Sequence, residues 1–386
     1  MLNSPYGGKL VNRIEMNKAQ KLTEESKEMR AIVPFIDFFY DTFKIADGSY
    51  SPLEGFMDEG TLNSVVEEGR LTNDLPWTIP IIMTISDEDK KGLKEGDSVV
   101  LKSKNGEAYA ILDIEQFYEI DRKKIARNVY GTEDIRHPNV EDLLTRYNKN
   151  AVSGKITVFK KLNLPGGKYE YSPSEVRSIF ESRKWNNVVA YQARNPPHVA
   201  HEYLQKVSLE LPGIDGLFIH LVIGRLKKGD YRAGAILETY DTLIRNYHRE
   251  EKVVMGSLSI TMRYAGPKAA LFLAIIRRNY GATHYIIGRD QAGVSNFYDP
   301  YAAQKIFDEY DVGIVPLKYT ETFYCRRCNG ITSERVCPHG PDSRLNISQT
   351  RIREMLSNHE EIPTEIMRKE VADILSRGNV INMGED

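Results

Sequence analysis

The sequence predicts an α/β protein with a mainly β N-terminal domain, a central doubly wound parallel-sheet domain and a small C-terminal zinc-bearing domain. Three observations predict it: short extended runs with turn signals in the first part, apolar strand-like runs alternating with helical ones in the second, and a cysteine cluster near the C-terminus. A chain of 386 residues is long enough for two or three domains with cores of their own. We expect the boundaries at 1–168, 169–320 and 321–386.

The first region has the pattern of short strands. WTIPIIMTI (77–85) and SVVLKSKNGEAYAILDI (98–114) are rich in β-branched residues, and Asn105-Gly106 is a strong signal for a hairpin turn. A helical stretch is expected near EDLLTRY (141–147). This region is therefore predicted to form a small, mainly β domain.

From about residue 170, strands and helices alternate. SPSEVRSIFESRKW (172–185) begins with Ser and Pro, as helices often do. Helical stretches then separate apolar strand candidates, which are VVAY (188–191), GLFIHLVIG (216–224), VVMGSLSI (253–260), THYIIG (283–288) and GIVPL (313–317). Near-continuous apolar strands of this kind indicate a parallel sheet covered on both faces. The ligands of such sheets bind at the carboxyl ends of the strands.

Composition and charge narrow the class of protein. The net charge is −2, whereas a duplex binder usually carries a basic excess, so we expect no nucleic-acid partner. No apolar run approaches the roughly 18 residues of a membrane span, and the N-terminus lacks the apolar core of a secretory signal. We therefore expect a cytoplasmic enzyme with no membrane partner. Arginine is concentrated around loops of the second half, which suggests a small anionic ligand.

All three cysteines lie in FYCRRCNGITSERVCPHG (323–340). Cys325, Cys328, Cys337 and His339 form the pattern C-x2-C-x8-C-x-H, which suits tetrahedral zinc. The alternative is a cluster of reduced thiols, or one disulfide and a spare thiol. Four protein ligands leave no position for a reactive water, so the predicted zinc is structural. Two helical stretches are expected after it, in RIREML and EIMRKEVADILSRG.

QARNPPHVAH (192–201) follows the strand candidate VVAY and precedes a helix. We expect Pro196 or Pro197 in the first helical turn, with Asn195 as the N-cap. His198 and His201 would then share one helix face near the N-terminus, where free N–H groups and the helix dipole favour anions. A metal pair is the weaker interpretation, because helical zinc histidines more often sit four apart. A pair of capping or packing histidines is the other alternative.

Three more segments carry anion-binding groups at loops or helix starts. In IIGRDQAG (286–293), Gly288 and Gly293 permit close backbone approach and Arg289 offers a donor fork. In MRYAGPKAA (262–270), Gly266 and Pro267 open a helix. The fourth anion-rich segment, ISQTRIR, contributes Ser348, Thr350, Arg351 and Arg353.

Other polar residues of this region have two interpretations. Lys227, Lys228 and Asp230 in GRLKKGDYR either line the site or form a solvated turn. His220 and His284 lie in strand candidates and are expected to be core histidines.

QARNPPHVAH resembles the QxRNPxHxxH signature of the ATP sulfurylase (sulfate adenylyltransferase) family. The resemblance runs nearly from end to end, and the other segments that carry it are PYGGKLVNR (5–13), ADGSYSPLEGFM (46–57), MRYAGPKAA, GRDQAG, DPYAAQ and FYCRRC…CPH. It implies a PUA-like N-terminal domain, a Rossmann-like nucleotidyltransferase domain and the zinc-bearing segment of some prokaryotic members. No fused adenylylsulfate kinase is expected.

The resemblance also implies a reaction. The family converts ATP and sulfate, reversibly, into adenosine 5′-phosphosulfate and pyrophosphate by direct in-line attack of sulfate on the α-phosphorus. Sulfate is fully ionised at neutral pH and needs no general base, so the site has to supply positive charge and alignment. Mg²⁺ is expected with ATP, with few protein ligands of its own. A homodimer is expected by likeness to related prokaryotic enzymes.

Residue roles are carried over by matching position. Gln192, Arg194 and the backbone N–H of Ala292 match the groups that hold sulfate. The matching catalytic positions are Arg194, Asn195, His198 and His201, the two histidines contacting the ATP phosphates and stabilising the transition state. The matching ATP-binding positions are Gln192, Asn195, His198, His201, Gly288, Arg289, Asp290, Gln291, Ser348, Thr350 and Arg351, of which the last three are secondary candidates.

Two positions depart from the family pattern. Gln291 stands where GRDHAG has histidine, and glutamine can donate a hydrogen bond but is never cationic. Ala193 stands where a hydroxyl residue is frequent. Two rival functions stay open from the sequence: a nucleotidyltransferase with another acceptor, and a zinc-ribbon binding module on an α/β scaffold.

Overall fold

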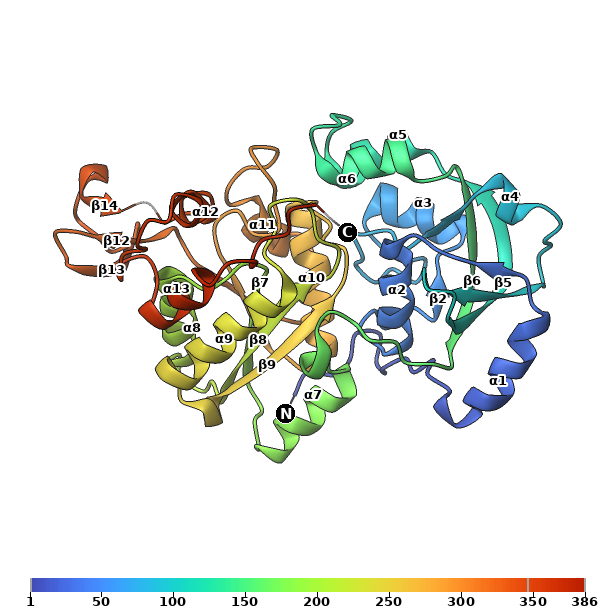
Figure 1. The fold of residues 1–386 in the computed structure, drawn as a ribbon, viewed down its shortest axis with the longest axis horizontal. Coiled ribbons are helices and arrows are strands. Elements are labelled where there is room, and N and C mark those ends of the chain that lie inside the picture. The colour runs from blue at the N-terminus through green and yellow to red at the C-terminus, as the bar shows by residue number, and fades with distance from the viewer. Residues whose placement is uncertain (1, 346, 385–386) are drawn as a thin grey trace.

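A six-stranded and a five-stranded sheet organise the chain, and a small three-stranded sheet near the C-terminus lies beyond the second (Figure 1). The structure is a computed structural model that describes residues 2–345 and 347–384. The N-terminal region forms one half of the molecule and the parallel-sheet region the other, with helix α10 (Pro267–Asn279) between the parallel sheet and the N-terminal region. Within the described ranges, no helix has the length and apolar character needed to cross a bilayer.

The first sheet has six strands in the order β1-β4-β5-β6-β2, with β3 paired to β6. All pairs are antiparallel except β1 with β4. The predicted hairpin is confirmed, since β4 and β5 pair around Asn105-Gly106 and Gly106 has a φ of 81°. The strands are β1 (Ala31–Ile32), β2 (Gly55–Phe56), β3 (Met83–Ile85), β4 (Ser98–Lys102), β5 (Ala108–Glu119) and β6 (Asn150–Val158).

Helices also contribute to this half. The stretch expected to be helical near residue 141 is helical, as α6 (Pro138–Glu141) and a π-turn over Asp142–Arg146. The pattern of extended runs did not predict α2 (Ile36–Ala46), which is rich in aromatic residues and buried along most of its length. The remaining helices of this half are α1 (Ala19–Glu25), α3 (Glu59–Glu68), α4 (Asp87–Lys90) and α5 (Arg122–Ile125).

The second sheet is parallel throughout, in the order β11-β10-β7-β8-β9. The chain adds strands in one direction from β7 to β9 and then returns to place β10 beside β7. This reversal creates the switch point of a doubly wound sheet between β7 and β10, as predicted. The strands are β7 (Val188–Ala193), β8 (Gly216–Ile223), β9 (Val253–Ser259), β10 (His284–Ile287) and β11 (Val315–Lys318).

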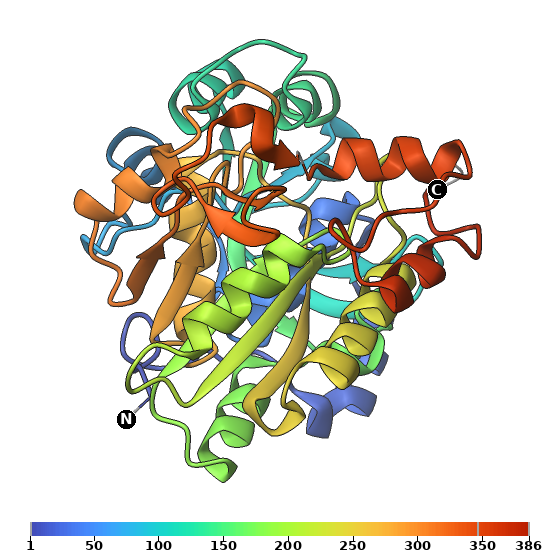
Figure 2. The same cartoon turned by 90° about the vertical axis from the view of Figure 1, so that its left-hand side faces the viewer.

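Both faces of this sheet are covered. Val189 and Leu217 share a core with α9 (Ala233–Tyr247), whereas Ala190 and Phe218, one residue along each strand, share a core with α10. Alternate side chains of one strand point to opposite faces, so the sheet separates two packed layers. Figure 2 shows α8 (Val199–Leu209) and α9 in front of the strands. The helices α7 (Pro173–Ser182) and α11 (Ala302–Lys305) complete the domain.

The C-terminal segment packs on the face of the parallel sheet that α8 and α9 cover. Strands β12 (Thr322–Cys325) and β13 (Gly330–Ser333) form a hairpin against α8, and β14 (Arg344–Leu345) pairs with β12. Helix α12 (Gln349–Ser357) confirms the expected start at ISQTRIR, with Ser348 as its N-cap. Helix α13 (Lys369–Leu375) packs against α9 and is shorter than its predicted stretch.

Two expectations about individual positions were wrong. Helix α8 begins at Val199, with extended His198 at the cap position, so neither Pro196 nor Pro197 is helical and Asn195 is not the N-cap. The second proline explains why Pro196 is not helical, because a residue before proline is pushed out of the helical region. His220 is fully buried as expected, but His284 at the start of β10 is only half-buried.

Candidate active site

The loops that follow β7 and β10 meet at the switch point. They enclose a cavity of about 190 Å³ that Gln192, His198, His201 and residues 288–291 line, with 320–322 on the side of the β12–β13 hairpin. The fold therefore brings QARNPPHVAH and GRDQAG together, as adjacent strands of a parallel sheet require of the loops at their carboxyl ends.

The two histidines stack on each other. Their ring centroids lie 3.6 Å apart with the planes inclined by 22°, and Tyr191 lies against the second ring. Burial lowers the pKa of His201 to about 4. Burial, and then the neighbouring His201, hold the pKa of His198 well below its usual range. Both rings are therefore neutral at physiological pH, and among the described residues neither Nδ1 has a hydrogen-bond partner.

A chain of hydrogen bonds links the two loops. Gln291 Nε2 donates to Tyr285 Oη at 3.1 Å, and Tyr285 Oη donates to Gln192 Oε1 at 2.8 Å. Gln291 thus lies beside the candidate anion site and reaches it through a tyrosine. Tyr285 was not singled out from the sequence, where it is one aromatic residue of an apolar strand.

The GRDQAG loop has a strained backbone. Asp290 and Ala292 have φ values of 54° and 58°, in the left-handed region that side chains other than glycine disfavour. The Ala292 carbonyl accepts a 3.1 Å hydrogen bond from the amide of Gly266, itself at a φ of 52°. A Cβ at Gly266 would lie 2.6 Å from the Tyr298 ring, so the close approach of this backbone to Tyr298 requires glycine. Strain of this kind concentrates at functional sites.

Arg194 is half-buried and paired. Its Nη2 donates to Asp230 Oδ1 at 3.0 Å, and its guanidinium lies 4.9 Å from the Tyr264 ring centroid. Burial lowers the pKa of Arg194, Asp230 opposes the shift and Arg353 adds to it. Because arginine starts from a very high pKa, the side chain stays cationic. Asp230 of GRLKKGDYR therefore contacts the candidate site through Arg194.

The start of α12 reaches the same loop. Arg353 Nη2 donates to Asn195 Oδ1 at 3.1 Å, and Gln349 Nε2 donates to the Pro196 carbonyl at 3.0 Å. Thr350 and Arg351 are exposed, and Ser348 accepts a capping hydrogen bond. Of the four residues singled out in this segment, Arg353 thus makes a contact with the loop, whereas Ser348 caps the helix. Gln349 was missed, although its i, i+4 spacing to Arg353 places both on one helix face.

Arg289 lies at the mouth of the cavity with its side chain 43% exposed. Its Nη1 is 3.2 Å from Asp290 Oδ2 and 3.5 Å from Glu321 Oε1. These are long, exposed ion pairs of small energy, so a ligand can displace them. Glu321 immediately precedes β12 and links this arginine to the hairpin.

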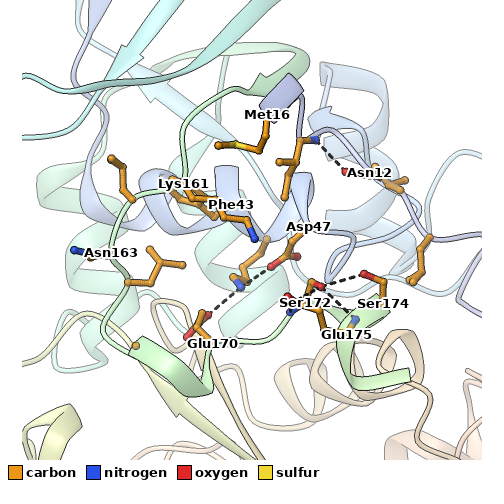
Figure 3. A pocket seen from close by; sticks show the side chains of 17 residues that line it. Asn12, Met16, Phe43, Asp47, Lys161, Asn163, Glu170, Ser172, Ser174 and Glu175 are labelled. Carbon is orange, nitrogen blue, oxygen red and sulfur yellow. Dashed lines mark hydrogen bonds and ion pairs between the residues drawn. The ribbon is translucent and has the colours of Figure 1, made fainter. Parts of the chain in front are cut away.

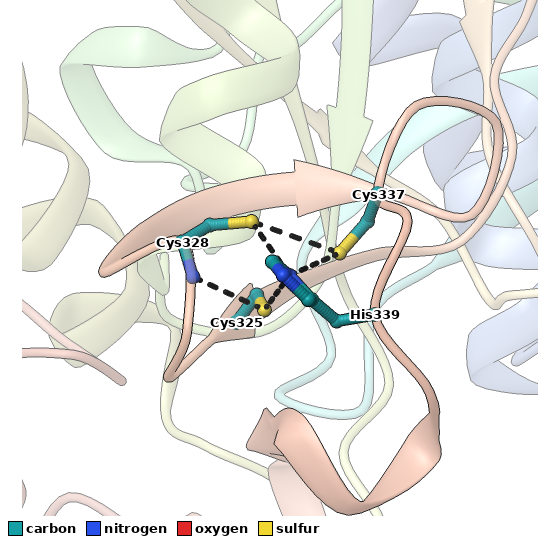
Figure 4. A group of neighbouring side chains, drawn as sticks. All are labelled: Cys325, Cys328, Cys337 and His339. Atoms are coloured by element: carbon teal, nitrogen blue, oxygen red, sulfur yellow. Dashed lines mark hydrogen bonds between the residues drawn. The ribbon is translucent and has the colours of Figure 1, made fainter.

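Four potential metal ligands converge at the tip of that hairpin (Figure 4). The Sγ atoms of Cys328 and Cys337 are 3.8 Å apart, and His339 Nδ1 lies 3.2–3.8 Å from the three sulfurs. A tetrahedral zinc with Zn–S bonds of about 2.3 Å places two sulfurs about 3.8 Å apart. The distance is far too long for a disulfide. The donor set and its spacing therefore fit a metal ion.

A larger cavity, of about 650 Å³, lies between the N-terminal segment, α2 and the segment 161–175 (Figure 3). At its base the buried Lys44 Nζ contacts Asp47 Oδ2 at 2.7 Å and Glu170 Oε1 at 3.0 Å. Burial alone would lower the pKa of Lys44, but the two carboxylates hold it well above its usual range. The charges there are already paired, and no loop residue following β7 or β10 lines the cavity. Its size therefore does not make it the active site.

Comparisons with known proteins agree with this architecture. Residues 167–378 match the ATP-sulfurylase family model and residues 3–161 match a PUA-like domain. A sulfate adenylyltransferase of Staphylothermus marinus is 44% identical over 380 residues, covering 97% of this chain and 98% of the relative. That of Hyperthermus butylicus is 43% identical over 377 residues, covering 97% and 96%.

A solved structure shares the fold. The hexameric APS kinase from Thiobacillus denitrificans superposes with a TM-score of 0.79 at 22% identity, over 98% of this chain and 69% of that one. The N-terminal half is thus a PUA-like domain and the parallel sheet a nucleotidyltransferase-like domain. The chain belongs to the ATP-sulfurylase family.

Proposed function

We propose that this protein is a sulfate adenylyltransferase that transfers the AMP moiety of ATP to sulfate, giving adenosine 5′-phosphosulfate and pyrophosphate in a reversible reaction. The observation that carries the proposal is the meeting of Gln192, His198, His201 and the GRDQAG loop around one cavity. Full-length relatives named sulfate adenylyltransferase support the choice of acceptor.

The residue roles follow the chemistry of the groups. Gln192, Arg194 and the Ala292 amide are proposed to hold sulfate. His198 and His201 are proposed to contact the ATP phosphates, together with Asn195 in the same loop. The further proposed ATP contacts are Gly288, Arg289, Asp290, Gln291, Ser348, Thr350 and Arg351, and we add Arg353 because it reaches Asn195.

The reaction is an in-line displacement. A sulfate oxygen forms a bond to the α-phosphorus while the bond to the bridging oxygen breaks, and pyrophosphate leaves with that oxygen and its electron pair. No proton has to move from sulfate, so no general base is needed. Two anions have to approach each other, and the cationic Arg194 and the hydrogen-bond donors of the loops favour that approach.

Metal ions have separate places in this proposal. Cys325, Cys328, Cys337 and His339 would hold a structural zinc, because four ligands complete its tetrahedron. Mg²⁺ would enter with ATP and keep most of its water ligands. The carboxylates that line the cavity are Asp290 and Glu321.

The proposal also covers the cellular location, the oligomeric state and the domain boundaries of the protein. We propose a cytoplasmic homodimer, by likeness to prokaryotic relatives. We propose that the three domains span residues 1–168, 169–320 and 321–386. The match to the PUA-like domain ends at residue 161 and the match to the ATP-sulfurylase family begins at residue 167, which supports a first boundary in this region.

Pyrophosphate release from ATP tests the activity when it is assayed with sulfate, with molybdate and without an acceptor. Release is expected with both anions, and molybdate should give AMP because its mixed anhydride hydrolyses. Release that depends on neither anion would contradict the proposed acceptor. Release that requires a phosphorylated small molecule would favour the rival nucleotidyltransferase.

ATP binding is expected to take up protons in acid. Free His201 has a pKa of about 4, and nearby phosphates favour the protonated ring, so binding raises that pKa. Between the free and bound pKa values the complex holds more protons than the free enzyme, and well above both it does not. ATP affinity should therefore rise as the pH falls from about 8 to about 5.5.

Titration calorimetry in two buffers of different ionisation enthalpy measures this uptake directly. The variant His201→Asn keeps a polar side chain but cannot be protonated, so its uptake should be smaller. Equal proton numbers in the variant and the parent protein would remove His201 from the phosphate site.

A further inference from the structure

Hydrogen bonds within the protein decide whether the candidate sulfate site offers a ligand donors or acceptors. Tyr285 Oη donates to Gln192 Oε1 at 2.8 Å, which leaves the Gln192 NH₂ group as the end of the amide available to a ligand. We propose that Tyr285 is a specificity-determining positioning residue, which presents Gln192 to the acceptor as a donor only and thereby selects anions that carry no proton. This inference rests on the proposed function.

Tyr285 is held so that its hydroxyl cannot turn away. It is fully buried on β10, where it pairs in register with Ala190 of β7. Its hydroxyl has a single hydrogen, and Gln291 Nε2 donates to the same oxygen at 3.1 Å. The accepting side of the hydroxyl is therefore occupied, and its hydrogen is left for Gln192. This assigns a role to Gln291 that does not require the positive charge of a histidine.

The other acceptor oxygens near Arg194 are also occupied. Asp230 Oδ1 accepts from Arg194, and Asp230 Oδ2 accepts from the Lys227 amide at 2.9 Å. Asn195 Oδ1 accepts from Arg353 at 3.1 Å. The side-chain oxygens of Gln192, Asn195 and Asp230 thus each have a donor within the protein. A bound anion therefore finds no unpartnered carboxylate or amide oxygen among these three side chains. The two carboxylates that line the cavity, those of Asp290 and Glu321, are ion-paired with Arg289 at 3.2 and 3.5 Å.

Such a site separates two anions of equal shape and charge. In mildly alkaline buffer, hydrogen phosphate and sulfate are both tetrahedral and doubly negative, but only hydrogen phosphate has an O–H group. That hydrogen needs an acceptor, and leaving it without one in a desolvated site costs binding free energy. Sulfate, selenate and molybdate have no such hydrogen. The arrangement therefore favours them over phosphate and arsenate.

The variant Tyr285→Phe tests this directly. Without the hydroxyl, the Gln192 amide is free to rotate and present Oε1, which repels sulfate but accepts a hydrogen bond from the O–H group of hydrogen phosphate. The ratio of the phosphate inhibition constant to the KM for sulfate is expected to fall by about tenfold or more. The KM for sulfate and the KM for molybdate should both rise by a similar factor. The KM for ATP should change by less than about twofold.

Tyr280→Phe is the matched control. It removes a buried, hydrogen-bonded tyrosine hydroxyl after the C-terminal end of α10, and that hydroxyl contacts Ser49 and Tyr171. It should leave the phosphate-to-sulfate ratio unchanged even where it lowers thermal stability. A general loss of packing would instead change both variants alike.

Three outcomes separate the explanations. Sulfate-dependent activity in Tyr285→Phe with an unchanged ratio overturns the inference and leaves the proposed function intact. No anion-dependent pyrophosphate release from the parent protein overturns the proposed function itself. Where Tyr285→Phe does not fold, Gln291→Met decides, since it frees the Tyr285 hydroxyl to rotate. Its ratio should fall by about threefold, and an unchanged ratio overturns the inference.

Discussion

Replacing Arg194 with alanine is expected to abolish sulfate-dependent turnover while leaving the fold intact. Removal of a single charge-stabilising donor from an active site typically costs a factor of about 10² to 10³ in rate. Here the loss should exceed that, because Arg194 is proposed both to bind sulfate and to offset the approach of two anions. Steady-state kinetics with sulfate as the varied substrate measures it, and circular dichroism checks the fold.

Two further variants distinguish charge from geometry. Arg194→Lys keeps the charge but lacks the planar fork, so it should recover only a small part of the activity. Asp230→Asn keeps Arg194 and removes the charge of the carboxylate that orients it at 3.0 Å. It should be impaired less than Arg194→Ala. Retained activity in Arg194→Ala would show that this side chain does not belong to the anion site.

Loss of the metal is the second large effect. The variant Cys325→Ser should lower the zinc content from about one ion per chain to almost none. Zinc binding contributes on the order of 10 kcal/mol to the folded form of small zinc modules, so the hairpin β12–β13 should open. Proteolysis and amide hydrogen exchange within 322–345 are expected to increase, and the thermal transition should move down.

Catalysis should suffer less than stability. The hairpin supplies only one side of the cavity, through residues 320–322, and Arg289 has Asp290 as a second ion-pair partner. We expect kcat/KM for ATP to fall by less than about tenfold at temperatures below the transition. His359→Asn, an exposed histidine outside the cluster, is the control. Lost catalysis with an intact hairpin would contradict a structural metal.

Much of the fold follows from local patterns. The strands of the parallel sheet were predictable because buried parallel strands are apolar without interruption. The helix α2 was not predictable in this way. Its sequence IDFFYDTFKIA is aromatic and β-branched, and burial against the first sheet outweighs those local preferences.

The site was predictable to the extent that its residues lie next to one another in the sequence. The loops after β7 and β10 each contain their own polar groups, and the topology then has to bring them together. Tyr285 and Gln349 were missed because they contribute through partners far away in the sequence, which no local pattern records. Arg353 was singled out from its segment, but its partner Asn195 could not be predicted. The left-handed conformation of Ala292 was also hidden, since glycine usually marks such a position.

The contacts from α12 to the loop after β7 have a consequence for synthesis on the ribosome. The strands of the parallel sheet are complete once residue 318 has emerged, so that domain can begin to fold then. Asn195 and Pro196 receive their partners Arg353 and Gln349 only after more than 30 further residues have followed. The nascent domain can thus form its sheet before α12 is available to hold the loop after β7 in place, and we expect activity to appear only after that contact has formed.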